Sequence, residues 1–243
     1  MTEPDAFSPV ATARRLVREA RTAALATIAR RTGHPFGSMV SVACEPDGTP
    51  ILLMSTLAAH SRNLADDPRA SLLFVDPVAP DPQQGARVTV VGRVEEIAAP
   101  AEAARRYLAR LPEAALYAGF GDFAFFRLVV EDAHLVAGFG RAMRVRREDL
   151  LLDLSGADAL VTGEAVLVAR LDADRARLAA WGARLGAPAG EIHVVGLDPE
   201  GLDLSTSSDE SRRYLRVVLP KTNVDPEEFE ARLRHWEESL SMQ

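Results

Sequence analysis

The segment that most constrains the fold runs over residues 38–74, where three apolar runs are separated by two polar breaks. The first break contains Asp47-Gly48, and a glycine after aspartate supplies the positive φ that a tight hairpin turn requires. We therefore predict that residues 39–43 and 51–56 pair as antiparallel strands. A third strand is predicted after the second break, ending near Phe74.

The second break places four polar residues directly after a strand, at the predicted start of a helical turn: His60, Ser61, Arg62 and Asn63. Backbone N–H groups at a helix start favour an anion, and the planar donor fork of arginine matches phosphate oxygens. This pattern predicts a phosphate site. The simpler interpretation is that His60 caps a helix and Arg62 is a solvated surface charge, and the residues alone leave both interpretations open.

The remaining patterns in the first 150 residues predict few helices and many strands. Ser8-Pro9 starts a helix that continues over residues 11–22, with serine as N-cap and proline at the first helical position. Further strands are predicted at residues 23–29, 86–97, 122–130 and 133–138, the last two paired across a Glu131-Asp132 turn, with a loop at residues 30–37 and helices at residues 100–111 and 112–117. About seven strands with few helices between them favour a closed antiparallel barrel, since closure removes exposed edges.

The composition changes near Leu151, after which helical patterns dominate. A helix is predicted over residues 163–185, interrupted near Gly182, and strands over residues 192–196, 202–205 and 212–219. A last helix starts with Asp225 as N-cap, Pro226 at the first position and a glutamate at the third. The predicted fold class is α+β, with a barrel domain at residues 1–150 and a smaller α+β domain at residues 151–243.

Charge and cysteine content exclude several classes of partner. The net charge of −7 gives no general attraction for nucleic acid or an anionic membrane, so an anion needs a local cluster. The single cysteine, Cys44, excludes an internal disulfide and is expected to be a small core residue, and no cysteine and histidine set has zinc spacing. The first residues are unlike a signal peptide, and no run of 18 apolar residues occurs. We therefore expect a soluble, cytoplasmic protein.

Several ordered motifs resemble the pyridoxamine 5′-phosphate oxidase-like FMN-binding split barrels, and in particular their haem-utilisation (HugZ-like) branch. The matching strings are Ser55-Thr56-Leu57, His60-Ser61-Arg62-Asn63-Leu64, Asp67-Pro68-Arg69, Ser71-Leu72-Leu73, residues 87–92, residues 122–128 and the GFGRA loop at residues 138–142. Residues 196–204, residues 216–220 and the last helix resemble the second domain of that branch. The chain departs from the branch at residues 170–175, where two histidines of the usual motif are replaced by Arg170 and Arg175.

The resemblance implies an FMN site that is completed by a homodimer. It places Met39, Val40 and Ser41 along the flavin ring, Met54, Ser55 and Thr56 beside the ribityl chain and phosphate, His60, Ser61, Arg62 and Asn63 around the phosphate, and Arg87 at the phosphate or the ring edge. The main hypothesis is therefore an FMN-dependent oxidoreductase with an unknown small substrate. No catalytic side chain is assigned, because the flavin itself carries the redox chemistry.

The same resemblance implies an alternative in which haem binds at the dimer interface and undergoes oxidative breakdown. Arg141 matches the basic residue of the GFGRA loop, and His235 is the histidine nearest the C-terminus. The helical spacing of Phe229, Leu233 and Trp236 forms an apolar face, which favours His235 as a surface residue. A third hypothesis is a non-catalytic regulatory protein that retains the barrel dimer as a scaffold.

Overall fold

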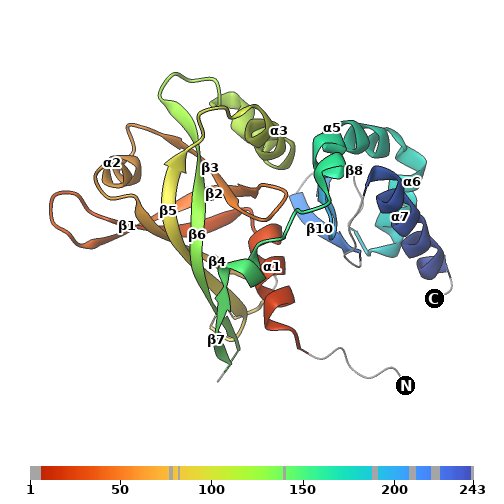
Figure 1. Cartoon of the computed structure of the whole chain (residues 1–243), viewed down its shortest axis with the longest axis horizontal. Helices are drawn as coiled ribbons and strands as arrows, with labels where there is room; N and C mark the ends of the chain where they lie inside the picture. Colours follow the sequence, from red (N-terminus) through yellow and green to blue (C-terminus); the bar gives the residue numbers. More distant parts are fainter. Residues whose placement is uncertain are drawn as a thin grey trace. The chain divides into compact units, whose positions relative to one another are not determined.

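The structure is a computed structural model, and it describes residues 7–76, 79–81, 83–138, 141–187, 191–207, 212–219 and 225–241. Contacts within the chain separate two compact units, Met1–Leu152 and Asp153–Gln243 (Figure 1). The first unit contains the strands of one sheet and the second contains a smaller sheet with helices. That the first domain is of the FMN-binding type and the second of the haem-utilisation type remains a prediction.

The first unit consists of seven strands and short helices. Its elements are α1 (Pro9–Glu19), β1 (Thr22–Ile28), β2 (Pro35–Cys44), β3 (Pro50–Ser55), α2 (Ala59–Asp66), β4 (Arg69–Val75), β5 (Ala86–Glu96), α3 (Ala101–Arg110), the 3₁₀ helix η1 (Pro112–Leu116), β6 (Phe123–Ala137), β7 (Ala142–Arg146) and α4 (Arg147–Leu150).

The strands form an antiparallel sheet in the order β3-β2-β1-β4-β5-β6-β7, and a further pairing of β3 with β6 closes six of them into a barrel (Figure 1). The predicted barrel and hairpin are confirmed. In the hairpin, Val42 pairs with Leu52 and Cys44 with Pro50, and Gly48 in the turn has a φ of 97°. Leucine and valine side chains of the strands fill the barrel interior, including Leu25, Val42, Leu52, Leu72 and Val88.

The prediction of two strands at residues 122–130 and 133–138 is wrong, because β6 continues through both. Glu131-Asp132 does not turn the chain. The carboxylate of Asp132 instead accepts hydrogen bonds from the Arg144 guanidinium on β7, at 2.9 and 2.7 Å. Val91 of β5 pairs with Asp132 and Gly92 with Val130, so Glu131 is the extra residue of a bulge in β6.

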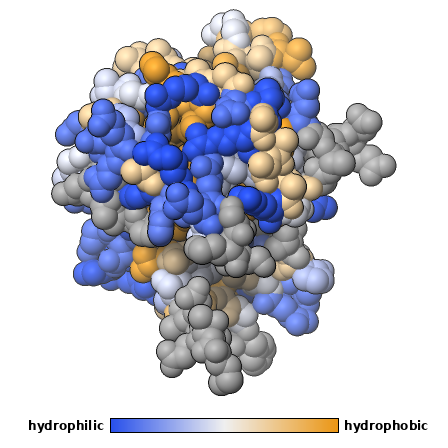
Figure 2. All heavy atoms as spheres, turned by 90° about the vertical axis from the view of Figure 1, so that its right-hand side faces the viewer, coloured by the Kyte–Doolittle hydropathy of each residue, from blue (hydrophilic) through white to orange (hydrophobic). Residues whose placement is uncertain are grey.

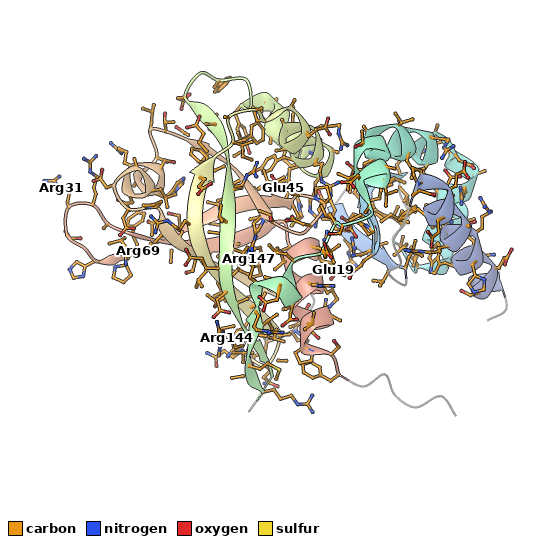
Figure 3. All side chains as sticks on the ribbon, viewed as in Figure 1. Glu19, Arg31, Glu45, Arg69, Arg144 and Arg147 are labelled. Carbon is orange, nitrogen blue, oxygen red and sulfur yellow. The ribbon has the colours of Figure 1, made fainter. Side chains whose placement is uncertain are left out.

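The predicted loop at residues 30–37 is also shorter than expected, because β2 already begins at Pro35. Phe36 pairs with Thr27 of β1, and at this end β2 pairs with β1 alone. Proline is accepted here because it is the first residue of the strand. Arg31 lies in the remaining connection and points away from the barrel (Figure 3).

A second apolar cluster lies outside the barrel, between the outer faces of β2, β3 and β6 and helix α3. It contains Ile51, Leu53, Tyr107 and Phe125, all of which are buried. The Tyr107 and Phe125 rings meet edge to face, with centroids 5.6 Å apart. This packing holds α3 and η1 against one side of the barrel, beside the end of β3.

The second unit is a three-stranded antiparallel sheet with helices, which confirms the α+β class. Its elements are α5 (Asp158–Ala173), α6 (Arg175–Arg184), β8 (Glu191–Asp198), β9 (Gly201–Ser207), β10 (Arg212–Val218) and α7 (Pro226–Ser241). The helix predicted over residues 163–185 is two helices, and the break lies at Asp174 rather than near Gly182. The Asp174 carboxylate caps α6 by accepting a hydrogen bond from the Arg177 N–H at 3.1 Å.

A buried ion cluster fixes the sheet of this unit. The Arg216 guanidinium on β10 lies 2.8 Å from the Asp198 carboxylate and 3.0 Å from that of Asp203 on β9. In the view of Figure 2, hydrophilic residues make up much of the surface that is drawn in colour. Among the described residues, no helix is long and apolar enough to span a bilayer.

Candidate cofactor site on the outer face of the barrel

A cavity of about 320 Å³ lies on the outer face of the barrel, where β2, β3 and the first residue of β6 meet the start of α2 and the aromatic residues near α3. It brings together part of the predicted site, namely Met39, Val40, Ser41, Met54, Ser55 and His60. The remaining lining residues are Leu53, Ala58, Tyr107, Tyr117 and Phe123.

Aromatic residues form one wall of this cavity. Tyr107 is fully buried, and its hydroxyl donates to the carbonyl oxygen of Ser41 at 3.4 Å. Burial raises the pKa of Tyr107 well above its usual value, so the phenol stays protonated and neutral. The rings of Tyr117 and Phe123 lie with centroids 5.0 Å apart. The wall is suited to a flat, largely apolar ligand.

Hydrogen bonds of Ser55 and Thr56 to neighbouring residues stabilise the end of the cavity where β3 leads into α2. The Ser55 hydroxyl donates to the Asp122 carboxylate at 2.6 Å and accepts from the Leu57 N–H at 3.1 Å. The Thr56 N–H donates to the carbonyl oxygen of Asp122 at 2.7 Å. Ser55 therefore joins β3 to the segment before β6 and orients the turn that leads to His60. Thr56 itself is exposed and does not line the cavity.

The four residues of the predicted phosphate site, all on α2, lie in different environments. His60 is half-buried and lines the cavity, and burial lowers the pKa of its imidazole, which favours the neutral form. Ser61 is buried, and its hydroxyl has no hydrogen-bond partner among the described residues. Arg62 is exposed. Asn63 is buried and donates to the Thr27 hydroxyl at 3.0 Å, which attaches α2 to β1.

Two predicted residues lie at the other end of the barrel from the cavity. Arg87 pairs with Val136 near the end of β6, and Arg141 lies just before β7, with its guanidinium 5.2 Å from the ring centroid of Phe7. Phe123, in the cavity, is the first residue of β6, so the strand separates the two ends by roughly 45 Å at about 3.3 Å per residue. Arg144 on β7 lies at the same end as Arg141 (Figure 3). Within one chain, neither predicted arginine joins the cavity.

Sequence reasoning did not assign the aromatic lining. Tyr107 and Tyr117 were placed only as parts of predicted helices, and Phe123 only as part of a strand. They reach the cavity because α3 and η1 pack on the outer face of the barrel, which no local pattern encodes. The one available signal is that two of the three tyrosines of the chain follow each other closely in this helical region.

The surface assignment of His235 is confirmed, because its side chain is 86% exposed on α7 and lies 3.9 Å from Glu238. Phe229 and Leu233 are fully buried on the opposite side of that helix. Cys44 is half-buried in β2, where its thiol donates to the carbonyl oxygen of Val17 at 3.6 Å. Neither residue belongs to the cavity.

Comparisons with known proteins support the assignment of this fold. The model of the CREG β-barrel family matches residues 4–151. A solved structure of Atu2129, a protein of unknown function from Agrobacterium tumefaciens, is 31% identical, covers 97% of each chain and has a TM-score of 0.80. A haem-binding protein from Mycobacterium smegmatis is 30% identical over 99% of this chain and 100% of its own, with a TM-score of 0.55.

A curated relative is the chloroplastic non-canonical haem oxygenase HOZ of Arabidopsis thaliana, 37% identical over 141 residues. The aligned segment spans 56% of this chain and 42% of that relative's length. The family model covers more than half of the present chain and coincides with its barrel unit. The protein therefore belongs to the CREG β-barrel family, and its first unit has the closed antiparallel barrel that the sequence predicted.

Proposed function

We propose that this protein binds haem at the cavity between β2, β3, α2 and α3. The observation that carries the proposal is the composition of the cavity, which combines apolar and aromatic walls with one half-buried imidazole, that of His60. A haem-binding protein that is similar over the whole chain and a haem oxygenase that is similar over the barrel support this choice of ligand.

The residues of the cavity fit the chemistry of haem. The haem macrocycle is flat and apolar, and the aromatic wall of the cavity offers it an apolar surface. Met39, which is 70% exposed, adds an apolar side chain at the edge of the cavity. The carboxylates of haem require a cation, and the exposed Arg62 is a candidate because it has no ion-pair partner among the described residues. When bound, haem supplies an iron centre for oxygen chemistry. Oxidative haem breakdown is the reaction to assay, and haem binding without turnover would favour the non-catalytic hypothesis.

FMN is the competing ligand, and its support is the fold of the barrel. The buried, unpartnered hydroxyl of Ser61 and the neighbouring Arg62 are the groups that would favour a phosphate. Arg87 and Arg141, which the flavin and haem predictions also used, do not reach the cavity within one chain. Their participation depends on a second copy of the protein.

The outer face of the barrel supplies a surface for that second copy. Ala24 pairs with Met39 on one side and Leu73 on the other, so these three side chains share one face. Leu73, Val75 and Val91 are 36%, 41% and 38% exposed on this outer apolar face, which continues into the cavity at Met39. A homodimer through this face would cover the exposed apolar side chains and enclose the ligand.

Titration with hemin, followed by visible absorption, tests the proposed function. The wild-type protein is expected to give a saturable Soret band at one haem per chain. Ala58→Trp fills the cavity and is expected to weaken binding by at least about tenfold, since one lost contact of 1.4 kcal/mol already has that effect. Ala59→Trp is the matched control, because Ala59 is exposed and does not line the cavity.

Two outcomes would overturn the proposal. One is a wild-type protein that shows no saturable Soret band, in particular one that binds FMN instead. The other is an Ala58→Trp variant that binds hemin as tightly as the Ala59→Trp variant, which would place haem elsewhere on the chain.

A further inference from the structure

The chain contains five histidines, all among the described residues. His34 and His134 are exposed, and His235 is exposed on the last helix. His193, in the second unit, has its Nδ1 atom 3.2 Å from the Asp172 carboxylate. His60 differs from these four because it lines the cavity on the barrel.

The His60 ring is held in the cavity wall without a protein partner. Neither ring nitrogen has a hydrogen bond or an ion pair to another described residue. The imidazole is half-buried, and its pKa is lowered by desolvation. A neutral imidazole with a free nitrogen is the form of histidine that binds metal ions. A ring nitrogen without a protein partner is satisfied by water or by a ligand.

The helix that carries His60 is attached to the barrel before its first residue and again at Asn63, so the position of the His60 backbone is defined. Before the helix, the Ser55 hydroxyl binds the Asp122 carboxylate at 2.6 Å. One turn after His60, the Asn63 side chain donates to Thr27 at 3.0 Å and accepts from the Arg30 N–H at 3.1 Å. A metal ligand needs such preorganisation, because a ring that is free to rotate loses entropy when it binds.

The other side chains of the cavity are poorer iron ligands. Tyrosine binds haem iron as the phenolate, and burial raises the pKa of both Tyr107 and Tyr117, which disfavours that form. Met54 is buried and belongs to the interior cluster of the barrel. Met39 is largely exposed on the outer sheet face.

We infer that His60 would bind the haem iron in this protein, an inference that rests on the proposed haem-binding function. The C-terminal histidine implied by the family resemblance, His235, lies on the exposed side of α7. We assign the role of iron ligand to His60 instead, which lies on a different helix, at the start of α2. Ser55, Asp122 and Asn63 are then positioning residues, since they hold the helix that presents the ring.

The test compares hemin complexes of the wild-type protein, His60→Ala, His60→Gln and His34→Ala. The wild-type ferrous complex is expected to show the iron–imidazole stretching band in resonance Raman spectra. The band should be lost in both His60 variants, return when free imidazole is added to His60→Ala, and be unchanged in His34→Ala. Haem affinity should fall on the order of 10- to 100-fold or more, since even partners of a ligand cost that much in metal sites.

The outcomes separate this inference from the function on which it rests. If the wild-type protein gives no Soret band with hemin, the proposed function fails and the ligand assignment with it. If hemin binds and the iron–imidazole band persists in both His60 variants, or is missing from the wild-type complex, haem binding stands and the assignment of His60 is overturned.

Discussion

Ser55 shows how a single hydroxyl organises the site. Its bond to the Asp122 carboxylate is short, at 2.6 Å, and connects β3 to the residue that precedes β6, the strand whose pairing with β3 closes the barrel. The resemblance to flavin proteins implied that Ser55 contacts the cofactor directly. In the structure the hydroxyl is engaged with protein groups on both its donor and acceptor sides, so its main effect is on the position of the turn before His60.

Ser55→Ala is expected to lower the free energy of unfolding by about 1.5–3 kcal/mol, because a hydrogen bond to a charged group is lost and the partly buried Asp122 is left without it. Urea unfolding measures this change. Ser155→Ala is the matched control, since its hydroxyl binds the Asp153 carboxylate at the same 2.6 Å distance but in an exposed, local turn. An equal loss of unfolding free energy in the two variants would contradict the role given to the hydrogen bond between Ser55 and Asp122.

The site residues that the sequence predicted are those in continuous local segments. Met39, Ser41 and His60 follow from two strands and the turn after them, together with the family resemblance. Tyr107 and Phe123 could not be predicted, because only the packing of α3 and the closure of the barrel bring them beside those strands. Arg87 was predicted by position in a motif, and a motif does not show that β5 carries the residue to the far end of the barrel.

At the scale of elements, the bulge at Glu131 of β6 lets two long strands, β5 and β6, stay paired on both sides of it. Gly92 lies in close contact with β6, and a Cβ atom at this position would be 2.0 Å from the Val129 carbonyl oxygen. Backbone atoms cannot move aside as a flexible side chain does. The glycine is therefore required at this close approach of β5 to β6, beside the bulge.

Gly92→Ala is expected to destabilise the protein by about 1–3 kcal/mol or more through this overlap. Thermal or urea unfolding measures the effect. Gly119→Ala is the control, because a Cβ atom there has nothing within 4 Å, and its effect is expected within about 1 kcal/mol of zero. A Gly92→Ala variant as stable as the Gly119→Ala variant would show that the strands separate without cost.

Most elements could be predicted because their signals are local. The Asp47-Gly48 turn, the Ser8 cap and the Asp225 cap each depend on a few adjacent residues, and each lies where expected. The errors arose where tertiary contacts override local chemistry. Asp132 is polar enough for a turn, yet its partner on β7 stabilises it within a strand. Asp174 caps a second helix, so the break between the two helices lies there and not near Gly182 as predicted.

At the scale of the whole molecule, we propose that a second copy bound at the outer apolar face of the barrel encloses the cavity. Leu73→Glu places a charge at the centre of this face and is expected to weaken self-association by at least about tenfold, since burying an unpaired carboxylate costs more than 1.4 kcal/mol. Sedimentation velocity over a range of protein concentrations measures it. Val166→Glu is the control, because Val166 is 75% exposed on α5 in the second unit.

A wild-type protein that stays monomeric at high concentration would contradict the proposed dimer face. So would a Leu73→Glu variant that associates as strongly as Val166→Glu. If the dimer is confirmed, haem affinity should also fall in Leu73→Glu, because the second copy covers the ligand that extends beyond the cavity at Met39.

The most direct test of the account is the position of iron in crystals grown with hemin. An anomalous difference map at the iron absorption edge locates the metal without reference to the protein coordinates. We predict one iron peak per chain in the cavity on the outer face of the barrel, within coordination distance of a ring nitrogen of His60. An iron peak elsewhere on the chain, or crystals that contain FMN in the cavity and no iron, would contradict it.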